Sequence, residues 1–288
     1  MGVAHQFLDT NGVRLHVVTA GPSDGPLVVL LHGFPEFWYG WLPQIEHLAA
    51  RGYRVLAPDQ RGYNTSDKPA EVAAYRLDIL GEDIRGLIRA MGRTKAFLVG
   101  HDWGGAVSWW LAGTSPELIE RAVVLNMPHP AVLRRKMLRD FGQLKRSWYI
   151  GLFQLPLLPE RLLTQDRGAR MAEMMRRTSA PGAFSDADLE RYRDAWQQPG
   201  AARGMLSWYR TLSRAPLPEP PSLQLEVPLL MLWGEQDVAL GPELVDLSLP
   251  YCRRGRAVRV PQATHWIHHE VPERVNAEIS AFFEEEPS

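Results

Sequence analysis

Short apolar runs recur along this chain, and segments with helical periodicity separate them. The runs lie at residues 27–31, 53–57, 96–99, 122–125, 229–233 and 257–260. The runs are apolar at consecutive rather than alternate positions, with Arg54 and Arg259 as the exceptions. We therefore expect strands buried on both faces, as in a parallel sheet covered by helices. Helical patterns fill gaps between the runs at residues 38–51, 77–91, 104–114 and 272–284. This alternation predicts an α/β fold.

The N-terminal segment supplies two further strands. Residues 5–8 and 13–19 flank Asn11-Gly12, a dipeptide typical of a two-residue β-hairpin turn. Together with the six buried runs, the hairpin gives a predicted sheet of eight strands, most of them parallel.

One segment interrupts the alternation of strands and helices. Residues 130–216 show no convincing strand pattern and are instead typical of helices, at 132–153, 159–177, 186–197 and 201–214. A stiff connector then follows, built from Pro216, Pro218, Pro220 and Pro221. An all-helical insertion in an α/β core is typical of a lid over a site. We therefore predict a core of residues 1–129 and 217–288 and a helical lid of residues 130–216.

The charge of the chain argues against a polyanionic partner. Its formal net charge is −1 at pH 7, so no strong overall field attracts nucleic acid or an anionic membrane. Arg134, Arg135, Lys136 and Arg139 are interrupted by apolar residues, which favours a solvated helix face over a nucleic-acid patch. We therefore expect neither nucleic acid nor a membrane as a partner.

Cys252 is the only cysteine, so the sequence permits no disulfide within the chain. A lone cysteine fits a reducing cytoplasm, and we expect a cytoplasmic protein. Residues 1–10 lack the pattern of a signal peptide, and no apolar stretch approaches the roughly 18 residues needed to span a bilayer.

The most informative motif follows the apolar run at residues 96–99. It reads Gly100-His101-Asp102-Trp103-Gly104-Gly105 and lies between a predicted strand and a predicted helix. The spacing matches the G-x-S-x-G nucleophile elbow, with Asp102 where serine usually stands. The sharp turn lifts the central side chain to the carboxyl end of the sheet, where open α/β sheets bind ligands. Asp102 is therefore our candidate nucleophile.

A simpler interpretation is that Asp102 caps the helix that begins near Gly104, because aspartate is a favoured N-cap residue. The catalytic interpretation is favoured by the presence of suitable partners. His265 follows the last predicted strand and is the candidate base, and Asp237 follows the strand at 229–233 and would orient it. The order nucleophile, acid, histidine is the one expected for an elbow hydrolase.

Other polar residues near these strand ends fit the roles less well. Glu235 is a weaker rival of Asp237, and Asn126 is not ionisable. His268 and His269 are expected at the start of the last helix and outside the site.

A loop after the strand at residues 27–31 completes the predicted site. It reads His32-Gly33-Phe34-Pro35-Glu36. We expect the backbone N–H groups of Phe34 and Trp103 to face the nucleophile and to form an oxyanion hole. Phe34, Trp103 and Phe153 are also predicted to contact the substrate.

An aspartate nucleophile restricts the chemistry. An ionised carboxylate is nucleophilic at neutral pH without a base. Its attack on a carbonyl carbon yields an anhydride and gains little, whereas its attack on an sp³ carbon with a leaving group yields an ester. We therefore expect epoxides or alkyl halides as substrates. His265, backed by Asp237, would activate the water that hydrolyses the ester on Asp102.

These motifs are similar to those of the α/β-hydrolase-fold epoxide hydrolases, and the resemblance covers essentially the whole chain. It implies that two lid tyrosines hold the epoxide oxygen while the epoxide is opened to a vicinal diol. The matching segments are Tyr149-Ile150-Gly151-Leu152-Phe153-Gln154 and Trp208-Tyr209-Arg210, so the resemblance assigns this role to Tyr149 and Tyr209. It also implies a cis peptide bond between Phe34 and Pro35.

Two alternatives remain open at this point. A haloalkane dehalogenase would use the same nucleophile. Trp103 follows Asp102 as in that family, and a second indole would come from Trp148, Trp196 or Trp208, but Phe34 stands where many dehalogenases carry asparagine. The other alternative is a non-catalytic ligand-binding protein of the same fold.

We expect no metal ion and no other cofactor. The histidines lack paired spacing with cysteines or carboxylates, and no glycine-rich phosphate loop follows the first strands. The expected partners are a small apolar epoxide and water. The sequence leaves open whether the protein is a monomer or a homodimer.

Overall fold

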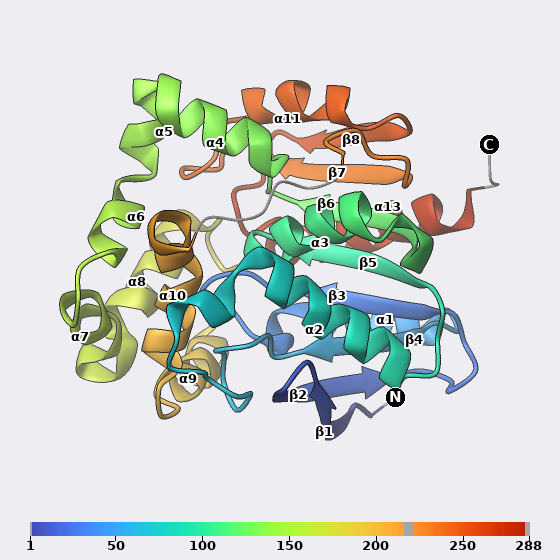
Figure 1. Ribbon diagram of the computed structural model, residues 1–288, viewed down its shortest axis with the longest axis horizontal. Coiled ribbons are helices and arrows are strands. Elements are labelled where there is room, and N and C mark those ends of the chain that lie inside the picture. Colours follow the sequence, from blue (N-terminus) through green and yellow to red (C-terminus); the bar gives the residue numbers. More distant parts are fainter. Residues whose placement is uncertain (1, 216–221, 286–288) are drawn as a thin grey trace.

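Eight strands form a single sheet in the order β1-β2-β4-β3-β5-β6-β7-β8 (Figure 1). The computed structural model describes residues 2–215 and 222–285. The strands are β1 (Ala4–Thr10), β2 (Val13–Ala20), β3 (Leu27–Leu31), β4 (Arg54–Pro58), β5 (Ala96–His101), β6 (Ile119–Leu125), β7 (Leu229–Gly234) and β8 (Gly255–Val260). β2 pairs with β1 and β4 in antiparallel fashion, and all other neighbours are parallel. The predicted eight-stranded, mostly parallel sheet is confirmed.

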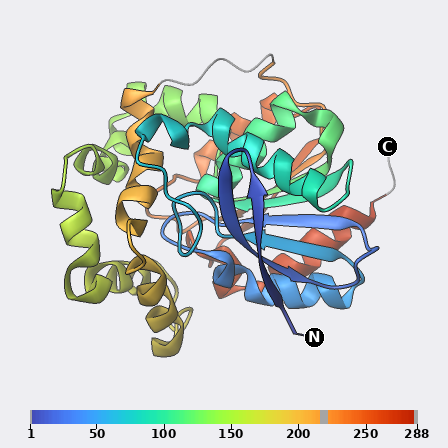
Figure 2. The same cartoon turned by 60° about the horizontal axis from the view of Figure 1, so that its bottom comes forward.

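Helices cover both faces of the sheet. In Figure 1 α2 (Leu77–Ala90) and α3 (Trp103–Thr114) lie in front of the strands, and α1 (Leu42–Ala50) and α13 (Pro272–Glu284) lie behind them. Shorter elements join these parts of the fold: η1 (Trp38–Trp41), η2 (Val72–Tyr75), η3 (Pro116–Leu118), α11 (Glu243–Ser248), η5 (Leu249–Tyr251) and α12 (Ile267–Glu270). The N-terminal hairpin of β1 and β2 forms one edge of the sheet (Figure 2).

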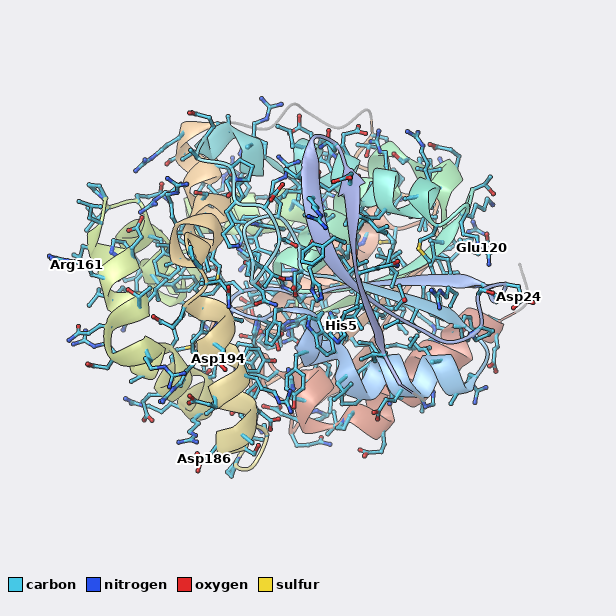
Figure 3. All side chains as sticks on the ribbon, turned by 90° about the horizontal axis from the view of Figure 1, so that it is seen from below. His5, Asp24, Glu120, Arg161, Asp186 and Asp194 are labelled. Atoms are coloured by element: carbon cyan, nitrogen blue, oxygen red, sulfur yellow. The ribbon has the colours of Figure 1, made fainter. Side chains whose placement is uncertain are left out.

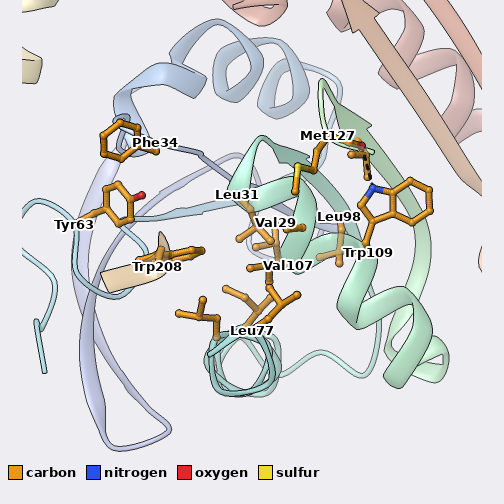
Figure 4. Packing of buried hydrophobic residues seen from close by; sticks show 14 of the residues in the cluster. Val29, Leu31, Phe34, Tyr63, Leu77, Leu98, Val107, Trp109, Met127 and Trp208 are labelled. Atoms are coloured by element: carbon orange, nitrogen blue, oxygen red, sulfur yellow. Dashed lines mark hydrogen bonds between the residues drawn. The ribbon is translucent and has the colours of Figure 1, made fainter. Parts of the chain in front are cut away.

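The fully apolar strands divide their side chains between two cores, one on each face. Val29 and Leu31 of β3 pack with α2 and α3, whereas Val28 and Leu30 pack with α1 and α13. Figure 4 shows the first core, where Leu77 and Val107 meet the side chains of the central strands. Burying one such aliphatic side chain contributes about 1.5–3 kcal/mol. The continuous apolar runs in the sequence therefore arise because both faces of the sheet are covered.

The chain between β6 and β7 is helical wherever the structure describes regular elements in it. Its helices are α4 (Pro130–Arg139), α5 (Phe141–Arg146), α6 (Trp148–Phe153), α7 (Leu158–Thr164), η4 (Gln165–Gly168), α8 (Ala169–Thr178), α9 (Asp186–Trp196) and α10 (Ala201–Arg214). We call these helices, residues 130–214, the helical insertion. It lies at one end of the sheet (Figures 1 and 2). The charged side chains of Arg161, Asp186 and Asp194 project from its outer surface (Figure 3).

Two of the helices expected in the insertion are broken in the structure. The segment 132–153 is not one helix but three, with breaks at Asp140 and Ser147. At the first break the Asp140 side chain accepts hydrogen bonds from Gly142 N (2.8 Å) and Gln143 N (3.2 Å) and so starts a new helix. The segment 159–177 is interrupted where Asp166 and Arg167 adopt positive φ. The expected proline connector lies outside the described residues.

Hydrogen bonds from aromatic side chains hold the helical insertion against the core. The indole of Trp208 on α10 donates to the carbonyl of Arg61 (2.9 Å), and the indole of Trp196 on α9 donates to the carbonyl of Pro35 (2.6 Å). Both indoles are buried, so each bond replaces one that water would otherwise supply. Among the described residues, no helix is long and apolar enough to cross a membrane.

The loop that binds Trp208 is itself fixed by a buried ion pair. The Arg61 guanidinium donates to both carboxylate oxygens of Asp83 on α2, at 2.8 and 2.7 Å, and Asn11 of the hairpin turn donates to the same carboxylate at 2.9 Å. This pair therefore joins the hairpin, the loop after β4 and α2.

We predict that Asp83→Ala destabilises the protein by about 3–5 kcal/mol, because it leaves the Arg61 guanidinium buried without its partner. Urea unfolding followed by circular dichroism measures the change. The control is Glu120→Ala, which removes the exposed partner of Lys95 and should cost at most about 1 kcal/mol. Equal effects of the two substitutions would contradict the prediction.

Candidate active site

The turn between β5 and α3 places Asp102 in a strained backbone conformation, with φ 49° and ψ −121°. A positive φ at a non-glycine residue costs of the order of 1–3 kcal/mol and persists only where the surroundings enforce it. Here the packing is tight, since a Cβ atom on Gly104 would lie 2.0 Å from the carbonyl oxygen of Leu31. The first turn of α3 can therefore approach β3 only if residue 104 is glycine.

The Asp102 side chain does not cap the helix that follows it. Asp102 occupies the N-cap position of α3, but its carboxylate makes no capping hydrogen bond. Instead, Oδ1 accepts a hydrogen bond of 2.9 Å from the backbone N–H of Phe34. Gly33 permits this approach, because a Cβ atom there would lie 2.4 Å from Cβ of Asp102. The Phe34–Pro35 peptide bond is cis, as the family resemblance implied.

The structure brings His265 and Asp237 to the same end of the sheet as Asp102. His265 Nδ1 lies 2.7 Å from Asp237 Oδ2, and His265 Nε2 lies 3.8 Å from Asp102 Oδ2. The imidazole thus stands between the two carboxylates. Of the two, Asp237 is the closer partner and sets the orientation of the ring.

Asp237 is buried and saturated with hydrogen bonds. Its Oδ1 accepts from the backbone N–H groups of Ala239 (2.8 Å) and Leu240 (3.0 Å), and its Oδ2 accepts from the Asn126 amide (2.8 Å). Asn126, which follows β6, thus supports the acid rather than replacing it. Glu235, the weaker rival, pairs instead with Arg259 at 3.2 Å.

Burial and neighbouring charges shift the pKa values of both Asp237 and His265. Burial raises the pKa of Asp237, but the adjacent His265 and the hydrogen bonds lower it to a net value below the ordinary one. For His265, burial lowers the pKa, whereas Asp237 and then Asp102 raise it, and the net value is about 9. At neutral pH the imidazole is therefore protonated where it lies between the two carboxyl groups.

Tyr149 of α6 and Tyr209 of α10 line the cavity that also contains Asp102 and His265. The two phenol rings lie 5.9 Å apart between centroids. Burial is the largest cause that raises the pKa of each phenol, and the charge of Asp102 raises both further. Both side chains therefore stay protonated at neutral pH and present O–H donors beside the Asp102 carboxylate.

The segments that carry the two tyrosines are bonded to each other. The Gln154 amide donates to the carbonyl of Tyr209 (3.0 Å), and Arg210 donates to the carbonyl of Phe153 (3.0 Å) and to Glu160 (2.6 Å). Gln154 and Arg210 stand in the two family segments quoted above, but sequence reasoning gave them no role. In the structure they fix the relative position of α6 and α10.

Sequence reasoning also missed a buried network around Glu36. Both oxygens of this carboxylate are occupied: Oε1 accepts from Tyr192 (2.8 Å) and contacts His269 (2.6 Å), and Oε2 contacts His101 and His268 (both 3.1 Å). The histidines hold the pKa of Glu36 well below its ordinary value against the opposing effect of burial. The network ties the loop of Phe34 to the elbow, to α9 and to α12.

His101 connects this network to His265. Its Nδ1 faces the Glu36 carboxylate, and its Nε2 lies 2.9 Å from the carbonyl oxygen of His265. Both partners are acceptors, so both contacts are hydrogen bonds only when both ring nitrogens carry hydrogen. The position of Glu36 and His101 inside the two quoted motifs was the signal that could have revealed them.

His268 and His269 therefore do not begin the last helix, as the sequence analysis expected. They lie on α12, which ends at Glu270 before α13 begins at Pro272. Among the described residues, Glu36, His268 and His269 also form the one group whose ligand atoms could hold a metal ion, all within 4.8 Å of one another. The Glu36 oxygens already lie at hydrogen-bond distance from His268 Nε2 and His269 Nε2, so a hydrogen-bonded network accounts for the cluster.

The cavity above Asp102 has a volume of about 1990 Å³. Phe34, Trp103 and Phe153, the predicted substrate contacts, all line it. Typical small-molecule sites measure about 300–1,000 Å³. The space therefore exceeds what a small epoxide or haloalkane fills.

Comparison with known proteins identifies the family. Residues 26–272 match the family model described as the alpha/beta hydrolase fold. The chain is 48% identical over 275 residues to the AB hydrolase superfamily protein YfhM of Bacillus subtilis (strain 168), with 96% of both chains covered. It is 37% identical over 288 residues to epoxide hydrolase 2 of Caenorhabditis elegans, in a match that covers 98% of this chain and 80% of that protein.

Solved structures agree with this result. The crystal structure of the Bacillus megaterium epoxide hydrolase in complex with an inhibitor superposes with a TM-score of 0.89 at 31% identity, and the match covers 97% of this chain and 100% of that one. The chain therefore belongs to the α/β-hydrolase family, and within it to the group that contains epoxide hydrolases. It is a hydrolase.

We predict that Asp102→Asn lowers the pKa of His265 by about one unit or more, because the neutral amide no longer favours the charged imidazole. Two-dimensional NMR of the imidazole resonances across a pH titration measures this shift from the value of about 9. Glu235→Gln is the control and should leave the pKa of His265 unchanged, since Glu235 faces Arg259. An unshifted His265 in Asp102→Asn would show that the two groups are not coupled.

Proposed function

We propose that this enzyme opens epoxides to vicinal diols through a covalent ester on Asp102. The observation that carries the proposal is that a carboxylate stands at the elbow, bonded to Phe34 N–H and 3.8 Å from His265, in the same cavity as Tyr149 and Tyr209. Relatives at 37% identity are named epoxide hydrolases, which supports the same substrate class. The helical insertion would act as a lid, with the predicted division into a core of residues 1–129 and 217–288 and a lid of residues 130–216.

In the first step Oδ2 of Asp102 attacks an epoxide carbon. Oδ1 is held by Phe34 N–H and becomes the carbonyl oxygen of the ester. As the C–O bond of the epoxide breaks, the oxygen develops alkoxide character, and Tyr149 and Tyr209 donate hydrogen bonds to it. One of the two tyrosines transfers its proton to that oxygen. The products of the step are a hydroxyalkyl ester on Asp102 and a tyrosinate.

In the second step water hydrolyses the ester. Once Asp102 is esterified, its negative charge no longer raises the pKa of His265. The imidazolium then gives its proton, through solvent, to the tyrosinate, and the neutral ring becomes the base that takes a proton from the attacking water. The attack on the ester carbonyl puts negative charge on Oδ1. Phe34 N–H stabilises it, together with the N–H of Trp103, which as the first residue of α3 has no partner within the helix. The imidazolium formed in this attack protonates the departing alkoxide, which leaves as the diol, and the proton of the Asp102 carboxyl group then passes to His265 and restores the starting state.

A haloalkane dehalogenase would need indole N–H groups to hold the departing halide. Trp103 and Trp148 line the cavity, but the indoles of Trp196 and Trp208 donate to the backbone carbonyls described above. Two of the four candidate indoles therefore already donate to the backbone and are not free to bind a halide, which favours an epoxide over a haloalkane as the substrate. Assays on panels of epoxides and haloalkanes, with Asp102→Ala as the inactive control, separate these functions. Tight binding of such ligands without turnover would instead indicate a non-catalytic binding protein.

We predict that replacing both Tyr149 and Tyr209 by phenylalanine lowers kcat for epoxides by about 10²-fold or more, because general acid assistance of this kind contributes about 10²–10⁴-fold. Steady-state assays of diol formation measure the loss. Tyr39→Phe is the matched control, since that hydroxyl bonds Asp188 on the outer part of the insertion. Unchanged epoxide turnover in the double variant would contradict the role of the two tyrosines.

We predict that His265→Gln blocks the second step but leaves the first intact. Intact-protein mass spectrometry after mixing with an epoxide should show an added mass equal to that of the epoxide, and peptide mapping should place it on Asp102. Asp102→Ala is the control that should acquire no added mass. Full multiple-turnover activity in His265→Gln would contradict the assignment of His265 as the base.

A further inference from the structure

Helices α4, α5 and α6 present a strip of large apolar side chains to solvent. Leu138 is 76% exposed, Phe141 81%, Leu144 50% and Trp148 67%. Phe141 and Leu144 are one helical turn apart on α5 and share a face. Large side chains of this kind rarely gather on a free surface without a partner. We call residues 134–148 the exposed strip.

The exposed strip is also strongly cationic, although the whole chain is not. Residues 134–148 contain six lysines and arginines and one acidic residue, Asp140, in a chain whose net charge is −1. Lys136 pairs with Asp140 at 2.6 Å. The other five cations, Arg134, Arg135, Arg139, Lys145 and Arg146, make no ion pair with any residue that the structure describes. The overall charge thus conceals a local excess of positive charge.

The strip borders the opening of the cavity that contains Asp102. Leu138 and Trp148 line this cavity and are nevertheless mostly exposed, so the cavity reaches solvent beside these two side chains. Arg139 and Lys145 line the cavity as well. A surface that binds this strip would therefore lie directly against the opening.

We propose that the exposed strip docks on an anionic lipid surface. Exposed Phe, Leu and Trp side chains beside unpaired Arg and Lys side chains are the combination that binds membrane interfaces, where the apolar groups enter the headgroup boundary and the cations meet anionic headgroups. A nucleic acid would use the cations but not the apolar side chains. A second copy of the chain, placed strip against strip, would bring the two sets of cations together and repel.

Docking places the opening of the cavity against the lipid, where apolar compounds concentrate. The cavity of about 1990 Å³ is large enough to receive a long or bulky apolar molecule from such a layer. This consequence rests on the proposed function, but the docking itself does not. Vesicle binding can therefore be measured without turnover, and its outcome is independent of whether the epoxide chemistry is correct.

The test is vesicle flotation of the full chain with two kinds of vesicle, phosphatidylcholine alone and phosphatidylcholine with about one third phosphatidylglycerol. We expect binding to the anionic vesicles that weakens as ionic strength rises. Phe141→Ser combined with Leu144→Ser should weaken the partition coefficient about tenfold or more, and Arg139→Gln combined with Lys145→Gln should do the same. Phe141 and Leu144 do not line the cavity, so the first variant should hydrolyse a water-soluble epoxide at the wild-type rate.

The matched control is Phe7→Ser combined with Arg89→Gln, which removes the same kinds of exposed side chain far from the strip. It should bind vesicles like the wild type. Equal binding to neutral and anionic vesicles, no binding to either, or an equal loss in the control would overturn the proposal. So would self-association in sedimentation experiments that Phe141→Ser with Leu144→Ser abolishes, because the strip would then be an interface between copies.

Discussion

The strained backbone of Asp102 is the constraint on which the rest of the site depends. A positive φ at this residue turns its carboxylate away from the helix it precedes and toward the loop after β3, where Phe34 N–H binds it. The turn is possible because the residues that would obstruct it are glycines, and because both faces of the sheet around β5 are packed by fully buried apolar side chains. A conformation that costs free energy locally is therefore held by the folding of the whole core.

The charges of Asp102 and Asp237 around His265 then decide which group acts in each proposed step. His265 lies between two carboxylates, which raise its pKa to about 9 against the effect of burial, so in the proposed mechanism it becomes a base only after Asp102 has been esterified. This coupling gives the two proposed steps their order. The Glu36 network also positions these groups, because it connects the Phe34 loop to His101, whose ring contacts the backbone of His265. The proposed oxyanion donor, Phe34 N–H, and the proposed base, His265, are thereby held on one buried framework.

The sequence predicted most of the fold because its signals were local. Continuous apolar runs and the Asn11-Gly12 turn identified the strands, and the elbow, the strand-end positions of Asp237 and His265, and the loop at 32–36 identified residues that the structure brings together. The misses have physical reasons as well. The breaks at Asp140 and at Asp166 depend on side-chain capping and on positive φ, which periodicity does not reveal. Two contacts of Glu36, those with His268 and His269, join residues more than 200 positions apart. Tertiary packing decides which apolar side chains near residues 134–148 stay exposed, and the sequence does not show this.

In the proposed mechanism Asp102, and not water, makes the first bond to the substrate. A single turnover of excess enzyme with an epoxide in ¹⁸O-labelled water tests it directly, with mass spectrometry of both the diol and the Asp102 peptide. If Asp102 attacks first, the diol takes its oxygen from the carboxylate and remains unlabelled, while the heavy oxygen appears in the Asp102 peptide. A labelled diol together with an unlabelled Asp102 peptide would show that water attacks the epoxide directly and would contradict the account.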